Sequence, residues 1–145
     1  MKGILIQDFL KGWFWSSMDF PEELQYIKEH IWVRVEGGKA VVGITDYAQS
    51  ELGKITSVEL PEVGDEIQQA DCFGSVEARK TVADLYAPLT GTILELNEEL
   101  LDNPALLNED PYDSGWIMVV SLDDPEELTL LLSAEEYAEA LEEFD

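Results

Sequence analysis

One lysine, Lys80, stands where two short strands would present a primary amine to solvent. Gly74 and the Ala87-Pro88 pair bracket segments 75–79 and 81–86, whose apolar residues alternate and do not recur at helical spacing. The first segment ends and the second begins at Lys80, so we expect a hairpin with Lys80 near its tip. A lysine on a surface turn is ordinary. An amine presented in this way is also suited to carrying an attached group.

The charge around Lys80 is strongly negative. Lys80 is the last basic residue of the chain, residues 81–145 contain 18 acidic residues, and the formal net charge is -24. Such a chain repels phosphate backbones and anionic lipid headgroups, so we expect neither nucleic acid nor membrane surfaces among its partners. The charge favours solubility and docking against basic surfaces of larger enzymes, and a merely solvated acidic face is the plainer alternative.

Two single residues restrict the chemistry further. Cys72 is the only cysteine, which excludes an intramolecular disulfide and favours a cytoplasmic location. We expect Cys72 to be a small packed residue without a catalytic role. His30 is the only histidine, and no cysteine set accompanies it, so no metal site of the zinc type is predicted. The carboxylates are scattered, as on a solvated surface.

The length and composition predict one domain with additions at both ends. A chain of 145 residues with 46% hydrophobic content can form one core of its own. We assign 1–22 to an N-terminal extension with the spacing of an amphipathic helix that packs on its own domain, 23–122 to a β-rich domain, and 123–145 to an acidic helical segment packed on it. No apolar run approaches the roughly 20 residues that cross a bilayer.

Local signals outline the elements around Lys80. Residues 30–44 form a predicted hairpin about a Gly-Gly turn, and 45–52 form a short helix with a threonine cap and a glycine stop. Ser133 and Glu136 fit a capping box at the start of a last helix. That helix should pack over the sheets.

The stretch from Glu77 to Pro88 resembles the lipoyl attachment motif of the glycine cleavage system H protein family, of the type Glu-Ser-Val-Lys-Ala-Ala-Ser-Asp-Leu-Tyr-Ala-Pro. Lys80 occupies the place of the lipoylated lysine, with Glu77 three residues before it and Asp84 four after it. The resemblance covers about Glu23 to the C-terminus through further motifs, among them Tyr26-x-Lys28-Glu29-His30-x-Trp32-Val33-Arg34, Gly43-Ile44-Thr45-Asp46-Tyr47-Ala48-Gln49, Val58-Glu59-Leu60-Pro61-Glu62-Val63-Gly64 and Asn108-Glu109-Asp110-Pro111-Tyr112.

The resemblance implies both a fold and a function. The fold is mainly β with peripheral α, a barrel-sandwich hybrid of the lipoyl and biotinyl type with a lysine-bearing hairpin and a C-terminal helix. The function is that of a non-catalytic lipoyl carrier with lipoate on Lys80, shuttling an aminomethyl group from glycine decarboxylase to aminomethyltransferase. Dihydrolipoamide dehydrogenase and a lipoate ligase or lipoyl transferase are the further partners.

The same resemblance implies candidate residues around the cofactor: Glu77, Asp84, Glu29 and His30. One family residue is missing, because Ile31 stands where the family has a glutamate between His and Trp. A charge-assisted hydrogen bond worth roughly 1.5 to 3 kcal/mol is therefore lost at that position. On an extended strand Glu29 would lie about 6.6 Å from Ile31, so we expect Glu29 to compensate only after a rearrangement.

Two alternatives stay open. One alternative is an H-like lipoate-binding carrier for another system, such as heterodisulfide-reductase-like sulfur oxidation. Three features favour it: Ile31 in place of the family glutamate, the altered basic residues around Lys80, and the N-terminal extension. An unmodified structural or regulatory paralogue is the second alternative, in which Arg79 and Thr81 prevent recognition by a ligase. Turnover of glycine distinguishes the two carriers, and intact mass distinguishes both from the unmodified protein.

Overall fold

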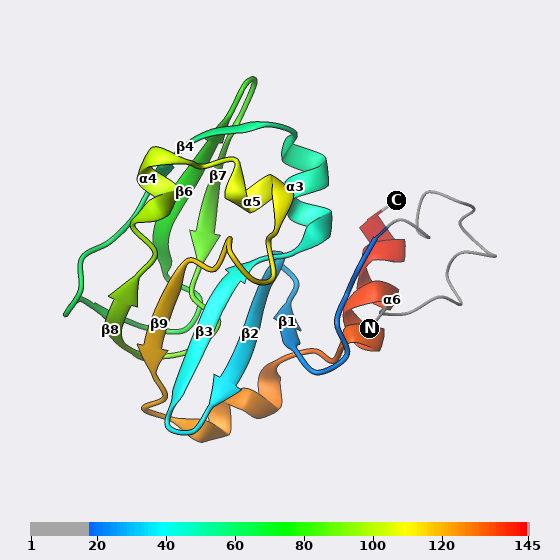
Figure 1. The fold of residues 1–145 in the computed structure, drawn as a ribbon. Coiled ribbons are helices and arrows are strands. Elements are labelled where there is room, and N and C mark those ends of the chain that lie inside the picture. The colour runs from blue at the N-terminus through cyan, green and yellow to red at the C-terminus, as the bar shows by residue number, and fades with distance from the viewer. Residues whose placement is uncertain (1–17, 145) are drawn as a thin grey trace.

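Two antiparallel sheets enclose the main hydrophobic core (Figure 1). They are seen in a computed structural model, which describes residues 18–144. One sheet has six strands in the order β1-β2-β3-β9-β8-β5, and the other has three in the order β4-β6-β7. The strands are β1 (Gln25–Ile27), β2 (Ile31–Glu36), β3 (Lys39–Ile44), β4 (Ile55–Glu59), β5 (Glu66–Ile67), β6 (Cys72–Ala78), β7 (Val82–Tyr86), β8 (Gly91–Leu96) and β9 (Met118–Ser121).

Short helices lie around these sheets. They are α3 (Asp46–Leu52), α4 (Glu99–Asp102), α5 (Leu106–Glu109), the 3-10 helix η1 (Pro125–Leu130) and α6 (Ala134–Phe144). The predicted mainly β fold with peripheral helices and a C-terminal helix is confirmed. Of the helical extension expected at 1–22, residues 1–17 lie outside the described part of the chain, and residues 18–22 are not helical.

The predicted hairpin at 30–44 and the predicted capped helix are both present. β2 pairs with β3 from Ile31↔Ile44 to Glu36↔Lys39, and the turn between them uses Gly37 at a φ of 64°, a conformation that glycine adopts at little cost. At the start of α3, the Ala48 N–H donates to Thr45 Oγ1 over 3.2 Å. α3 ends at Gly53, whose φ is 74°.

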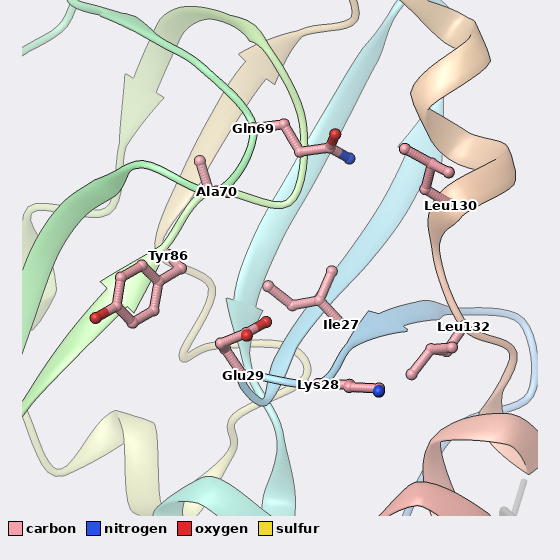
Figure 2. Close-up of a pocket in the computed structure, with 9 residues that line it drawn as sticks. Ile27, Lys28, Glu29, Gln69, Ala70, Tyr86, Leu130 and Leu132 are labelled. Atoms are coloured by element: carbon pink, nitrogen blue, oxygen red, sulfur yellow. The ribbon is translucent and has the colours of Figure 1, made fainter.

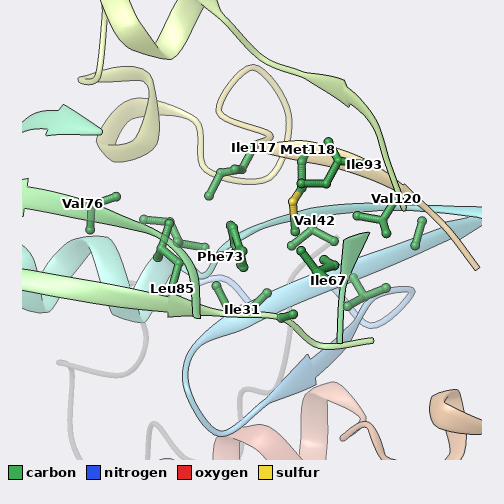
Figure 3. Close-up of a cluster of buried hydrophobic side chains, with 14 of the residues drawn as sticks. Ile31, Val42, Ile67, Phe73, Val76, Leu85, Ile93, Ile117, Met118 and Val120 are labelled. Atoms are coloured by element: carbon green, nitrogen blue, oxygen red, sulfur yellow. The ribbon is translucent and has the colours of Figure 1, made fainter. Parts of the chain in front are cut away.

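The main core lies between the two sheets (Figure 3). Val42 and Val120 enter it from the six-stranded sheet, and Val76 and Leu85 enter it from the three-stranded sheet. Each of these side chains is buried, and burying one such side chain contributes about 1.5 to 3 kcal/mol. This packing holds the strand pair β6 and β7, and therefore the residues between them, in a fixed place.

A second apolar cluster joins α6 to the six-stranded sheet. Tyr26 and Trp32 from the sheet are fully buried there together with Tyr137 of α6, and the rings of Tyr26 and Tyr137 are stacked with centroids 4.9 Å apart. Phe20 is buried in the same cluster and approaches Tyr137 edge-on at 5.2 Å. Figure 1 shows α6, in red, beside β1.

The predicted capping box at the start of α6 is confirmed. The Glu136 N–H donates to Ser133 Oγ over 3.1 Å, and the Ser133 N–H donates to the Glu136 carboxylate over 2.9 Å. Two backbone donors that the helix leaves without a partner are satisfied in this way. The prediction that this last helix packs over the sheets is confirmed as well.

Candidate functional site

Lys80 lies at the exposed tip of the hairpin formed by β6 and β7. The Ala78 N–H donates to the Thr81 carbonyl over 2.9 Å and closes the turn, next to the paired residues Glu77 and Val82. The side chains of Arg79, Lys80 and Thr81 are exposed, and within residues 18–144 no carboxylate forms an ion pair with Lys80. The sequence-predicted tip position is therefore confirmed, and the amine is open to reagents and enzymes.

Glu77 lies on the outer face of the three-stranded sheet. Its carboxylate accepts a hydrogen bond from Ser57 Oγ over 2.9 Å, and it borders a shallow depression together with Ser57, Glu59, Ser75 and Val82. Glu77 is thus close to Lys80 in the hairpin but is separated from the other candidate residues.

A cleft beside the edge strand β7 brings three of the other candidates together. Its volume is about 250 Å³, and we name it the β7 cleft; it is lined by Glu29, His30, Ile44, Tyr47, Ala48, Glu51, Leu52, Ala83, Asp84 and Leu85. Its apolar walls come from α3 and from β7, and its carboxylates are Glu29, Glu51 and Asp84, all exposed. An apolar pocket with acidic groups at its edge suits a cationic group on an apolar stem.

His30 is held in the wall of this cleft by its backbone and its ring. Its φ is 72°, a left-handed conformation that is uncommon outside glycine, and its backbone carbonyl accepts from the Thr45 N–H over 3.1 Å. The ring lies 4.8 Å from that of Tyr47, and Nδ1 is 2.7 Å from the Tyr137 hydroxyl. Burial lowers the pKa of His30 to about 4, so the imidazole is neutral at pH 7.

Glu29 occupies a different place from the one expected. β1 and β2 are joined by a turn at residues 28–30, and β2 begins only at Ile31. Because Glu29 is in this turn and not on an extended strand, it lines the β7 cleft with Asp84 without any rearrangement. The expectation that Glu29 would need a rearrangement was therefore incorrect. Ile31 is fully buried in the main core and is not among the residues that line the cleft.

A larger hollow lies at the other end of β7 (Figure 2). Its volume is about 420 Å³. Its lining comes from the end of β1 and the turn after it, the loop before β6, the end of β7, and the end of η1 with the segment that follows: Ile27, Lys28, Glu29, Gln69, Ala70, Tyr86, Ala87, Leu130 and Leu132. Glu29 borders both hollows. Lys80, Asp84 and His30 are absent from the lining of this one.

Sequence reasoning missed part of the β7 cleft. Tyr47, Ala48, Glu51 and Leu52 share one face of α3, and their helical spacing could have identified them as one wall. Tyr137 had no comparable signal, because its hydroxyl contacts His30 across 107 residues of sequence.

Three further observations concern Cys72, possible metal ligands and the lengths of the helices. Cys72 is exposed and not packed, and its Sγ lies 3.3 Å from the Gly74 carbonyl. Within residues 18–144, no group of three or more His, Cys, Asp or Glu residues could hold a metal ion. None of the helices in that range is long and apolar enough to cross a membrane.

Comparison with known proteins adds an independent observation. A family model described as glycine cleavage H-protein matches residues 24–144. The glycine cleavage system H protein of Staphylococcus saprophyticus is 56% identical over 126 residues, which are 87% of this chain and 100% of the relative. That of Geobacillus thermodenitrificans is 57% identical over 126 residues, 87% of this chain and 99% of the relative.

A solved structure agrees with the fold. The crystal structure of a glycine cleavage system H protein from Mycobacterium marinum superposes with a TM-score of 0.74 at 37% identity, covering 83% of this chain and 97% of that one.

Proposed function

This chain belongs to the glycine cleavage H-protein family, a family of non-catalytic lipoyl carriers, and we propose that its lipoyl group is attached to Lys80. The position supports this, because Lys80 is exposed at a hairpin tip whose backbone hydrogen bonds hold it in place. Amide formation removes the charge of the amine and leaves a long flexible arm. When bound, the lipoyl group supplies a dithiolane that exchanges between disulfide and dithiol and carries the one-carbon unit.

We propose that the lipoyl-lysine arm can fold back against the protein and bind in the β7 cleft. Four residues of extended strand separate Lys80 from Asp84, which is about 13 Å, whereas six separate Lys80 from Tyr86, which is about 20 Å. A lipoyl-lysine arm of about a dozen bonds extends to roughly 15 Å. On this estimate the arm reaches the β7 cleft at Asp84, whereas the part of the larger hollow beside Tyr86 lies beyond its length (Figure 2).

Within the cleft, Glu29 and Asp84 are the proposed partners of an ammonium carried by the arm. Both carboxylates border the same cleft as the apolar side chains of α3, so an apolar arm can pack on the helix while its charged end meets the acids. Glu29 thereby takes over from the glutamate that Ile31 replaces. Glu77 is left as a residue of the hairpin face near Lys80, with a role in recognition of the lysine by the modifying enzyme.

The proposed partners are those of glycine cleavage. They are glycine decarboxylase, aminomethyltransferase, dihydrolipoamide dehydrogenase and, for modification, a lipoate ligase or lipoyl transferase. The net charge of -24 supports docking on basic enzyme surfaces and opposes binding to nucleic acid or to anionic membranes. We also propose a cytoplasmic location and a division of the chain into an N-terminal extension (1–22), a lipoyl-carrier domain (23–122) and a C-terminal helical segment (123–145). The relatives named above favour glycine cleavage over an H-like carrier for sulfur oxidation.

The decisive experiment combines mass and turnover. After coexpression with a lipoate ligase, the wild-type protein should gain the mass of one lipoyl group and should support glycine turnover by glycine decarboxylase and aminomethyltransferase. Lys80→Arg keeps the charge at the tip but should show neither property, while the matched variant Lys54→Arg, at another exposed lysine, should show both. A lipoyl mass on Lys80→Arg would contradict the assignment. Lipoylation without glycine turnover would favour a carrier for sulfur oxidation. Absence of lipoylation from the wild-type protein would favour an unmodified structural or regulatory paralogue.

A further inference from the structure

The Tyr137 hydroxyl connects the C-terminal helix to two of the segments that form the β7 cleft, the β1–β2 turn and the start of α3. It lies 2.7 Å from His30 Nδ1 and 2.8 Å from Thr45 Oγ1. His30 lines the cleft directly. Thr45 caps α3, whose residues form the opposite wall, by accepting from the Ala48 N–H. A single phenol on α6 therefore contacts two of the three segments that surround the proposed position of the arm.

The direction of these hydrogen bonds follows because each buried hydroxyl hydrogen needs an acceptor. Thr45 is fully buried, and its hydroxyl oxygen contacts only the Ala48 N–H and the Tyr137 hydroxyl among the described residues. If Tyr137 donated to Thr45, the threonine hydrogen would have no acceptor, which is costly in a buried site. Thr45 therefore donates to Tyr137. The Tyr137 hydrogen is then left for His30 Nδ1.

This order of donors determines the state of the imidazole. Because Nδ1 accepts from Tyr137, the single hydrogen of the neutral ring is on Nε2. Burial raises the pKa of Tyr137 far above its ordinary value, so the phenol always keeps the hydrogen that it donates. Burial also keeps His30 neutral at pH 7. The ring orientation of His30 is thus set from a helix about a hundred residues away.

We infer that Tyr137 is a positioning residue for the β7 cleft: its hydroxyl fixes the Nε2–H tautomer of His30 and holds His30 against the Thr45-capped α3. This inference rests on the proposed function in so far as the cleft receives the arm. The C-terminal helix is then part of the device that retains the loaded arm, and it is more than a cover for the sheet.

Tyr137→Phe removes the hydroxyl and keeps the ring, and Tyr26→Phe is its matched control. Tyr26 is equally buried, stacks on Tyr137, and donates its hydroxyl to the Pro21 carbonyl over 2.7 Å, away from the cleft lining. Both variants remove a buried phenolic hydroxyl from the same aromatic cluster; Tyr26→Phe loses its one hydrogen bond to Pro21, and Tyr137→Phe loses those with His30 and Thr45. A difference between them therefore reports the contact with His30 and Thr45, and a shared loss of stability does not affect the comparison.

Two measurements test the inference. Because His30 is the only histidine, a long-range ¹H–¹⁵N spectrum of untagged protein shows one imidazole. At pH 7 it should show hydrogen on Nε2 in the wild type and in Tyr26→Phe, and a mixture of tautomers in Tyr137→Phe. Hydrolytic loss of the aminomethyl group from the loaded protein should be about 2- to 13-fold faster in Tyr137→Phe than in Tyr26→Phe, the factor that one neutral hydrogen bond represents.

The outcomes separate the inference from the proposed function. Hydrogen on Nδ1 in the wild type, or equal hydrolysis rates in the two variants, overturns the role of Tyr137 while Lys80 remains the carrier residue. A wild-type protein that protects its cargo no better than free aminomethyl-lipoamide overturns the proposed binding of the arm in the β7 cleft. Even in that case, the imidazole spectrum reports the tautomer of His30, because it can be recorded on protein with or without a lipoyl group.

Discussion

The lowered pKa of His30 makes the stability of this protein depend on pH in a predictable window. Its ordinary value is 6.5, and burial in the fold lowers it to about 4. Between these values the unfolded chain binds a proton on His30 that the folded protein does not, so unfolding takes up a proton and stability rises with pH. The contribution is complete above about pH 6.5 and is lost as the pH falls towards 4.

The size of the effect follows from the two pKa values. The difference between 6.5 and about 4 represents about 3 kcal/mol at about 1.4 kcal/mol per pKa unit. Relative to pH 7, linkage predicts a loss of about 2 kcal/mol by pH 5, with the remainder below that. Measurements at pH 5 to 7 stay clear of the isoelectric point near 4.1, where solubility is lowest.

His30→Asn isolates this contribution from that of the many carboxylates. Asparagine tolerates the positive φ of 72° at this position and does not titrate. Urea unfolding of both proteins at several pH values gives the difference in the free energy of unfolding. That difference should change by about 2 kcal/mol between pH 7 and pH 5, in favour of the variant at low pH. A difference that stays constant across this range would refute the buried, neutral state of His30.

Two further predictions concern the cleft and the sheet. Asp84→Asn and Glu29→Gln should each shorten the lifetime of the aminomethyl-loaded arm about 2- to 5-fold at low salt, because exposed charge pairs contribute about 1 kcal/mol or less and are screened by salt. Glu77→Gln is the control, because Glu77 lies outside the lining of the β7 cleft. An equal effect of all three substitutions would argue against binding of the arm in the β7 cleft. Gly43→Ala should lower the free energy of unfolding by about 1 to 3 kcal/mol, because its Cβ would lie 2.6 Å from the Trp32 ring. Gly38→Ala, whose Cβ would meet open space, should change it little, and similar urea midpoints for the two variants would contradict the close approach.

The local features of this protein could be predicted from its sequence because their causes are local. Strand alternation and the flanking glycine and proline placed Lys80 at a hairpin tip. The caps at Thr45 and Ser133 could be predicted from residue type, because each side chain bonds to a backbone N–H within the same helical turn. The resemblance around Lys80 indicated the family. None of these inferences required knowledge of which strands pair at long range.

The two incorrect expectations show where local reasoning ends. Side chains alternate between the two faces of a strand, so a shift of one residue in the pairing register moves a side chain from one face to the other; local sequence specifies neither the register nor the residue at which a strand begins. The late start of β2 places Glu29 in a turn beside Asp84. On β6, Phe73 takes the inward position and leaves Cys72 exposed, next to an irregularity in the pairing with β7.

By itself, the sequence determined which residue is presented for modification and how the elements around it begin and end, since neighbours along the chain decide both. Only the tertiary structure decided which residues form the β7 cleft. Its walls come from the β1–β2 turn, α3 and β7, and Tyr137 reaches it from a helix that packs on the opposite face of the six-stranded sheet. The pairing of strands and the burial of two separate apolar clusters bring these segments together, and neither is visible in a short stretch of residues.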